Sequence, residues 1–164
     1  MKKLTLTLLT CLFILSPNVV LGETVKWDDL VLREDVWFKK FTNVPFTGKT
    51  TGRVQGTLRN GKRDGFWVSY HDNGQLQWEG DYKNGKKEGL WVSYYDNGQL
   101  RYKGNHKNGK SEGRWVRYWK NGQLWLEGAD KNGKKEGRWV SYKEDGTVWE
   151  EFTGTFRNGK KISD

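Results

Sequence analysis

The sequence predicts an all-β fold: an elongated antiparallel β-meander of 24-residue β-hairpin repeats that form a single-layer twisted sheet. Three observations support this prediction: a regular repeat, paired turn residues at fixed positions within it, and an unusual composition. The 164 residues include 21 Gly and 10 Trp, and only 34% are hydrophobic. A globular domain with a layered core is about 45–50% apolar. Aromatic residues make up 15% of the chain, which is also unlike a disordered protein.

The repeat has a period of 24 residues and organises a predicted repeat domain over residues 45–164. Its full units are 60–83, 84–107, 108–131 and 132–157, with partial units at 45–59 and 158–164. The last full unit holds two extra residues between Val148 and Gly154. Columns of Gly, Trp, Val and Tyr recur at this step, among them Gly65, Gly89, Gly113 and Gly137, and Trp67, Trp91, Trp115 and Trp139. Units of this kind contact only their neighbours in an elongated solenoid.

Each unit is predicted to contain two short strands, of the types 90–94 and 75–82. Between them lie Asn-Gly pairs at 73–74, 97–98 and 121–122 and an Asp-Gly pair at 145–146. Such pairs tolerate positive φ and predict tight hairpin turns. A second Asn-Gly set, at 60–61, 84–85, 108–109 and 132–133, is expected to open a longer, Lys-rich loop to the next unit. Because all connections are short, neighbouring strands should be antiparallel.

The alternation of residues along the strands predicts two different faces. Leu76, Trp78, Gly80 and Tyr82 share one side of their strand. In the other strand of each unit, the Val and Tyr columns share a side and the Trp column faces the opposite one. We therefore expect one apolar face and one polar face that carries the Trp column.

Residues 1–22 have the layout of a secretory signal peptide. Lys2 and Lys3 precede an apolar run over 4–15, and Val20-Leu21-Gly22 supplies small residues for cleavage. We expect an exported protein, periplasmic or extracellular, after removal of residues 1–22. It would keep 27 Lys+Arg against 20 Asp+Glu, a charge of 27 − 20 = +7, and no Cys. Residues 23–44 lack the glycine pattern and are predicted to form an N-terminal cap of one or two irregular strands.

The recurring pattern Gly-x-Trp-x-x-Tyr-x-x-Asn-Gly-x-Leu-x-x-x-Gly-x-x-x-Asn-Gly resembles the bacterial variant of the MORN repeat, found in proteins of the YwqK-type antitoxin-like family. The resemblance covers residues 45–161. It implies an antiparallel β-meander with a shallow groove and a role in protein–protein contact or membrane association. An antitoxin would meet its toxin in the cytoplasm, which the predicted signal peptide does not favour.

No catalytic, metal or cofactor site is predicted. The repeat places His71 in a column with Tyr95 and Trp119, and His106 in one with Tyr82 and Asp130, so both are interpreted as surface positions. The acids that recur before the Gly column are interpreted as charged turns: Asp64, Glu88, Glu112 and Glu136. The sequence therefore predicts a protein that is not an enzyme.

Two features are candidates for a binding surface. The first is the Trp column, Trp67, Trp91, Trp115 and Trp139, with Trp78, Trp119, Trp125 and Trp149 beside it. Half-exposed rings bind sugars, peptides or lipid interfaces, but cross-strand rings also simply hold a sheet together. The second is a set of basic loops, Lys86, Lys87, Lys134 and Lys135, with Lys160 and Lys161. They could meet anionic lipids or acidic envelope polymers, or be a solvated edge that keeps sheets from joining.

The leading hypothesis is a non-enzymatic exported repeat protein whose aromatic and basic β-ribbon binds a protein partner or an anionic membrane surface. The alternative is a carbohydrate- or cell-wall-binding module, for which an envelope polysaccharide would be the partner. A third hypothesis, an antitoxin-like binding protein, holds only if residues 1–22 are not a signal peptide. No nucleic acid partner is expected, because export separates the protein from it.

Overall fold

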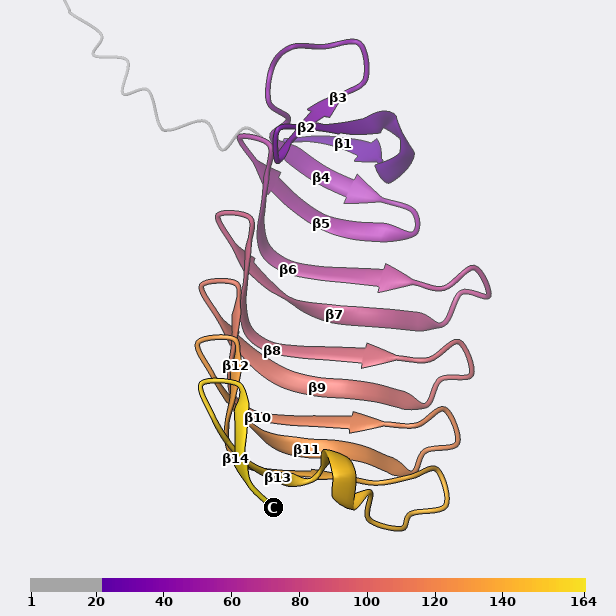
Figure 1. The fold of residues 1–164 in the computed structure, drawn as a ribbon. Helices are drawn as coiled ribbons and strands as arrows, with labels where there is room; N and C mark the ends of the chain where they lie inside the picture. Colours follow the sequence, from indigo (N-terminus) through magenta and orange to yellow (C-terminus); the bar gives the residue numbers. More distant parts are fainter. Residues whose placement is uncertain (1–21) are drawn as a thin grey trace, which may run out of the picture.

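A computed structural model describes residues 22–164, and the predicted signal peptide therefore lies almost wholly outside the described residues. Twelve strands form one open sheet in the order β1-β4-β5-β6-β7-β8-β9-β10-β11-β12-β13-β14, and β2 and β3 form a separate hairpin (Figure 1). The predicted all-β meander of hairpin repeats is confirmed. The strands of the repeats are β4 (Gly48–Thr51), β5 (Val54–Arg59), β6 (Lys62–Tyr70), β7 (Leu76–Lys83), β8 (Lys86–Tyr94), β9 (Leu100–Lys107), β10 (Lys110–Tyr118), β11 (Leu124–Lys131), β12 (Lys134–Ser141), β13 (Gly154–Arg157) and β14 (Lys160–Ser163).

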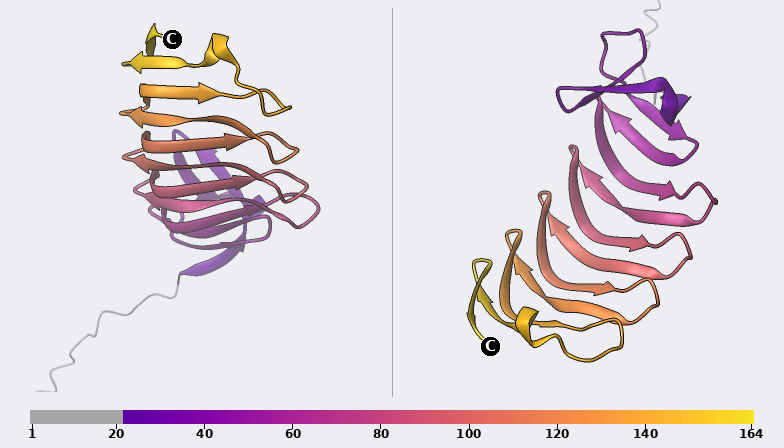
Figure 2. Two further views of the ribbon diagram at one scale, coloured as in Figure 1. Left: turned by 90° about the horizontal axis from the view of Figure 1, so that it is seen from below. Right: turned by 45° about the vertical axis from the view of Figure 1, so that its right-hand side comes forward.

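The strands do not lie flat but bend, so that the stacked hairpins form a curved trough (Figure 2). The bend lies at a glycine near the start of β6, β8, β10 and β12. In β8 and β10 this glycine is Gly89, with φ +66°, and Gly113, with φ +72°. The register of β9 against β10 shifts between Glu112 and Trp115, which marks a β-bulge at Gly113. A Cβ on Gly113 would meet nothing within 4 Å. Glycine is therefore needed at this position for its positive φ and not for space.

The two sets of Asn-Gly pairs have the opposite roles to those predicted. Asn84 and Gly85 both have positive φ, of 51° and 80°, and Lys83 pairs directly with Lys86. They form the tight two-residue hairpin turn between units. The 73–74 pair instead lies in a longer loop, in which the backbone N–H of Gln75 donates to Asn73 Oδ1 over 3.1 Å. The sequence prediction was wrong here because Asn-Gly favours both conformations, and strand pairing selects between them.

Gly98 occupies the longer kind of loop and has φ +81°. Gly98→Val should destabilise the protein by about 1–3 kcal/mol, because a β-branched residue is strained in this region of backbone space. Gln99→Val, one residue on and exposed, is the control and should change stability little. Thermal melting of the two variants checks the prediction, and equal melting temperatures would contradict it.

The prediction of the two faces was wrong for the Trp column. In the sheet register Trp91 lies opposite Gly80 on one side and Gly104 on the other, so it shares a face with these glycines. Its ring stacks on Trp78, with centroids 5.2 Å apart. Val92 instead pairs with Glu79 and lies on the other face. We call the side with the tryptophans the Trp face. The sequence could not show this, because it does not give the register between strands.

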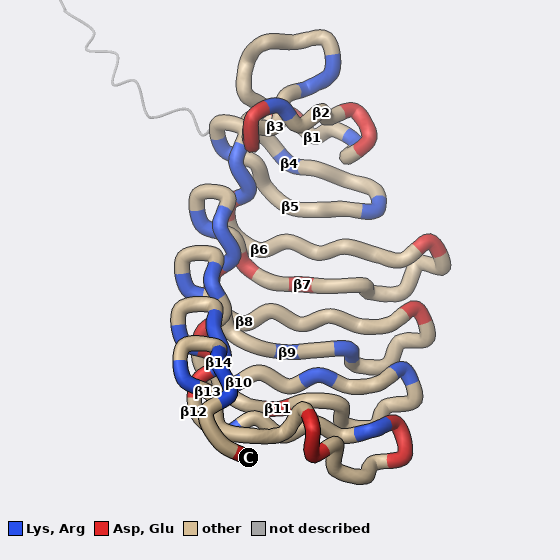
Figure 3. Tube along the Cα trace, viewed as in Figure 1, with Lys and Arg blue, Asp and Glu red and all other residues tan. Residues whose placement is uncertain are grey.

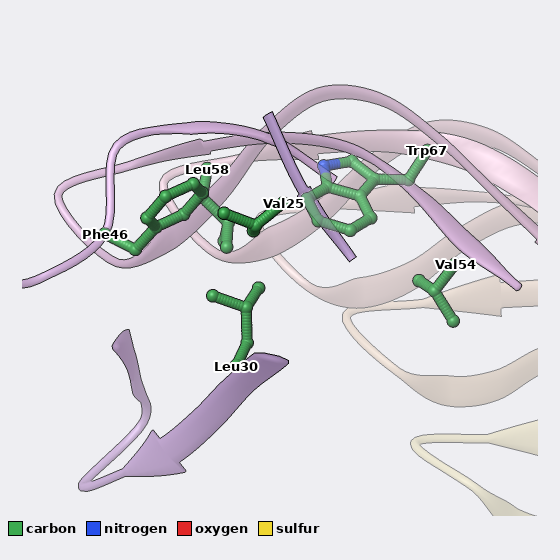
Figure 4. Packing of buried hydrophobic residues seen from close by; sticks show 6 residues of the cluster. All are labelled: Val25, Leu30, Phe46, Val54, Leu58 and Trp67. Atoms are coloured by element: carbon green, nitrogen blue, oxygen red, sulfur yellow. The ribbon is translucent and has the colours of Figure 1, made fainter. Parts of the chain in front are cut away.

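Residues 23–44 cover the first repeat. They form β1 (Glu23–Lys26), a short 3-10 helix η1 (Trp27–Asp29), and the hairpin of β2 (Leu30–Arg33) and β3 (Val36–Lys39). β1 pairs with β4 in parallel, so the expectation of antiparallel neighbours fails at this one junction. The cap buries a cluster around Trp67 (Figure 4): Val25, Leu30, Phe46, Val54, Leu58 and Trp67. At the other end, the two extra residues of the last full unit accompany a second 3-10 helix, η2 (Glu150–Phe152).

Candidate functional site

The tight turns form a regular column along one edge of the sheet. The turns at 108–109, 132–133 and 158–159 are fixed to the previous unit in the same way, as the first of them shows. The Gly109 N–H donates to the Lys87 carbonyl over 2.9 Å, and the Asn108 N–H donates to Glu88 Oε2 over 2.8 Å. A Cβ on Gly109 would lie 3.6 Å from Lys86 Cβ, so the lysine stem packs against the next turn. The turns, and the basic residues beside them, are therefore held in register.

A basic residue flanks every tight turn on both sides, and the two face each other across the hairpin. Figure 3 shows the resulting blue line along the edge. We call these residues the basic edge: Arg59 with Lys62, Lys83 with Lys86, Lys107 with Lys110, Lys131 with Lys134, and Arg157 with Lys160. All ten are exposed. Within residues 22–164 only Arg59 among them forms an ion pair, with Asp64. Like charges placed directly opposite one another destabilise a sheet.

A hollow of about 530 Å³ lies between the turns of the last units on this edge. Lys110, Lys131, Lys134 and Arg157 line it, and Glu136 is the one acid among them. The Glu136 carboxylate already accepts the Asn158 N–H over 2.9 Å. The hollow therefore presents a surplus of positive charge to solvent.

The four predicted lysines separate onto two surfaces. Lys86 and Lys134 belong to the basic edge, but Lys87 and Lys135 turn onto the Trp face. The Lys87 ammonium lies 4.0 Å from the Trp91 ring centroid. Burial, with the charge of Arg63 nearby, lowers the pKa of Lys87. Strand alternation separates adjacent residues in this way, so the Lys-Lys pairs do not act as units.

Most of the basic edge was not predicted, because the prediction rested on pairs of adjacent lysines. The signal that could have found it is the residue on each side of the Asn-Gly pairs, which is basic in all five turns. Lys107 and Lys110, for example, flank the turn at 108–109 and were not among the predicted site residues.

The four tryptophans of the predicted column are core residues. Trp67, Trp91 and Trp139 are 0–2% exposed, and Trp115 is 6% exposed. Of the two interpretations of this column, burial supports rings that hold the sheet together and not half-exposed rings that bind a partner. Each ring lies over a glycine: a Cβ on Gly104 would be 2.2 Å from Trp115 Cδ2. The column is therefore not an exposed binding surface.

The column that contains His71 joins consecutive units. His71 Nε2 lies 3.1 Å from the Tyr94 carbonyl, the Tyr95 hydroxyl donates to the Tyr118 carbonyl, and Trp119 Nε1–H donates to the Tyr142 carbonyl. Three chemically different side chains thus share one role, as donors to the next unit. A carbonyl accepts only, so His71 must carry its proton on Nε2. The interpretation of this column as a plain surface position was wrong.

His106 is half-buried and not a surface residue either. It lies on the Trp face between Trp91 and Trp115, with ring centroids 6.1 and 5.1 Å away. Burial, reinforced by the charge of Lys87, lowers its pKa below 6.5, while a backbone hydrogen bond at Gly109 and the charge of Asp130 oppose the shift. Its Nδ1 is buried and has no partner among the described residues.

Acidification should therefore weaken the fold in part through His106. Its folded-state pKa lies below the unfolded value of 6.5, so the unfolded chain takes up the proton first as the pH falls. The contribution to stability is complete above that value and is lost as the pH falls through the folded-state pKa. His106→Tyr installs the residue found at Tyr82 and should reduce the drop in melting temperature between about pH 8 and about pH 5. An equal drop in both proteins would count against this role.

Within residues 22–164 no group of three His, Cys, Asp or Glu side chains is arranged to hold a metal ion. The same residues contain no helix that is long and apolar enough to cross a membrane.

Three segments of the chain, residues 63–84, 87–108 and 111–128, match a family model described as MORN repeat variant. Three of the repeats therefore match the MORN repeat variant, which confirms that part of the resemblance. MORN repeats are in general non-enzymatic modules that bind proteins or membranes. No curated protein matches the chain.

Proposed function

We propose that this protein is a non-enzymatic, exported module that attaches to an anionic membrane surface through its basic edge. The observation that carries the proposal is the row of basic pairs at the five tight turns, exposed and held in register by the stacked hairpins. Residues that repel one another across each hairpin weaken the sheet. Their presence at every turn is explained if anionic groups bind between them.

A membrane suits this edge better than a single protein partner does. The edge repeats the same chemistry at every turn, which complements a surface of many equivalent phosphate headgroups. Each Lys or Arg near an anionic bilayer contributes about 1 kcal/mol. Several turns in simultaneous contact would therefore give useful affinity, although no single turn binds tightly.

The proposal includes export and leaves two other hypotheses to experiment. Intact-mass measurement on the extracytoplasmic fraction should find a chain that begins at Glu23 and carries no lipid; a retained Met1 or an acylated Cys11 would contradict this part. An acidic envelope polysaccharide could also neutralise the basic edge. The relation to bacterial antitoxin-like proteins stays a hypothesis that requires a cytoplasmic protein.

Sedimentation with vesicles tests the membrane proposal. The protein should bind vesicles of phosphatidylcholine mixed with phosphatidylglycerol, and not vesicles of phosphatidylcholine alone. Raising the salt from about 0.1 M to about 1 M shortens the screening length from about 10 Å to about 3 Å and should release it. The triple variant Lys86→Gln, Lys110→Gln, Lys134→Gln removes three charges from the basic edge and should bind at least tenfold more weakly.

The matched control is Lys103→Gln, Lys120→Gln, Lys143→Gln, which removes the same charge from exposed positions outside the basic edge. It should retain most of the binding. Equal losses in the two triple variants would show that only net charge matters and would overturn the assignment to this edge. Tighter retention on alginate than on the mixed vesicles would favour the polysaccharide hypothesis instead.

A further inference from the structure

The third unit departs from the others at three positions on the Trp face. Where the repeat has serine, it has an arginine; where the earlier units have large rings, it has smaller side chains. The three columns are Ser69, Ser93, Arg117 and Ser141; Trp78, Tyr102 and Leu126; and Tyr82, His106 and Asp130. The departures lie close together, because Leu126 pairs with Arg117 in the sheet.

The smaller side chains leave a cavity where the earlier units are filled. In the first units, Trp78 and Tyr82 pack on Trp91 with ring centroids 5.2 and 5.0 Å away. At the corresponding place in the third unit, Leu126 and Asp130 line an open pocket of about 530 Å³. Pockets that bind small ligands have volumes of about 300–1,000 Å³.

Aromatic rings form most of the pocket wall, and they come from two sources. Trp119 and Trp125 pack together with centroids 4.8 Å apart. Trp149 and Phe152, 4.6 Å apart, flank and end the 3-10 helix η2, which accompanies the two-residue insertion in the last full unit. Trp139, 2% exposed, closes the base. The insertion thus adds a wall that the regular repeat lacks.

The charges in the pocket are mainly positive. Arg117 is exposed at its rim, and the Lys135 ammonium lies 4.8 Å from the Trp139 ring centroid. Burial, with the charge of Arg117, lowers the pKa of Lys135. The one acid that lines the pocket, Asp130, accepts a hydrogen bond from the Ser111 hydroxyl over 2.5 Å through Oδ2. A bound anion would therefore meet two cations and one carboxylate that is already engaged.

Two of the neutral hydrogen-bonding groups of the wall are already used. The Ser141 hydroxyl donates to the Phe152 carbonyl over 3.1 Å, and Trp119 Nε1–H donates to the Tyr142 carbonyl over 3.0 Å. A neutral sugar, whose hydroxyl groups need several such partners, is poorly matched. What the pocket offers is aromatic surface beside positive charge.

We propose that this pocket binds an apolar carboxylate: an aromatic or aliphatic group, placed against the tryptophan rings, whose single carboxylate is held by Arg117 and Lys135. Such a ligand could be a small free acid or the C-terminal residue of a peptide, which share this chemistry. None of the pocket residues belongs to the basic edge, so the proposal does not depend on membrane binding.

Calorimetric titration with 2-naphthoate tests the proposal. The wild-type protein should bind this acid and should bind the uncharged 2-naphthamide at least tenfold more weakly. Leu126→Trp, which restores the ring found at Trp78, should fill the pocket and abolish binding while the melting temperature is maintained. Arg117→Ser, which restores the serine of the other units, should weaken 2-naphthoate binding several-fold and leave 2-naphthamide unaffected.

Arg114→Ser is the matched control, because Arg114 is exposed on the same strand and pairs with Glu127 outside the pocket. It should bind 2-naphthoate as the wild type does. Equal affinity for acid and amide, or unchanged binding in both Leu126→Trp and Arg117→Ser, would overturn the proposal. If Leu126→Trp fails to fold, the binding of 2-naphthoate and 2-naphthamide to Arg117→Ser alone tests the proposal.

A peptide distinguishes the two sources of the ligand. An N-acetylated dipeptide that ends in Phe with a free carboxylate should bind more tightly than 2-naphthoate if the natural ligand is a chain terminus, and more weakly if it is a small acid. Its amidated form should bind at least tenfold more weakly in either case, and equal binding of the two forms would contradict the role of the carboxylate.

Discussion

Trp91→Ala is expected to lower the free energy of unfolding by about 3–5 kcal/mol, the usual loss for a fully buried aromatic residue. The Trp91 ring is 1% exposed, and it contacts Trp78 and Tyr82 on one strand and His106 on the next. Its Nε1–H donates to the Asp81 carbonyl over 3.0 Å. The loss is a large part of the stability of a typical domain, about 5–15 kcal/mol. The variant should therefore melt at a much lower temperature than the wild type.

Leu90→Ala is the control for this prediction. Leu90 precedes Trp91 in the same strand, but it lies on the opposite face and is 54% exposed. Its truncation should change the free energy of unfolding by well under half as much. Urea denaturation followed by circular dichroism measures both variants. Similar losses for Leu90→Ala and Trp91→Ala would mean that the Trp column is not the core of the sheet.

Gly104→Ala should also destabilise the protein, by about 1–3 kcal/mol or more, although it adds only one methyl group. Gly104 is buried and lies opposite both Trp91 and Trp115 in the sheet. A Cβ there would be 2.2 Å from Trp115 Cδ2, so the ring or the strand must move. Asn105→Ala, exposed on the next residue, is the control and should be nearly neutral.

A double-mutant cycle shows whether the clash is the cause. Gly104→Ala combined with Trp115→Leu should cost less than the sum of the two single changes, because the smaller side chain makes room for the methyl group. Additive losses would place the effect of Gly104→Ala in the backbone and not against the Trp115 ring. Melting of all four proteins gives the comparison.

The turns illustrate how far local sequence signals reach. The Asn-Gly pairs, with the Asp-Gly pair at 145–146, placed the turns of the four full units correctly, because the need for positive φ at Gly85 or Gly98 is met within two residues of chain. They did not show which turn is the tight one. That choice depends on whether the flanking residues pair directly, as Lys83 does with Lys86, and pairing is a property of whole strands.

The candidate sites were predictable to different extents. The basic edge follows from the residues beside the Asn-Gly pairs at 60–61, 84–85, 108–109, 132–133 and 158–159, so the sequence contains it in full, although adjacent lysines proved the wrong signal. The aromatic pocket depends on side-chain volumes. Leu126 indicates a cavity only when it is compared with the larger Trp78 and Tyr102 at the same position of the neighbouring units. Its wall needs η2 as well, whose position over the Trp face comes from tertiary packing.

The sequence by itself determined the repeat unit, its all-β hairpins and the positions of its turns, because these rest on local backbone preferences repeated every 24 residues. The tertiary structure alone decided which side chains share a face. A shift of one residue in register exchanges the two faces of a strand, and the register that forms is the one that places Trp91 opposite Gly80 and Gly104. It thereby buries the tryptophans that the sequence left as a possible binding surface, and leaves the basic edge and the pocket beside Leu126 open to partners.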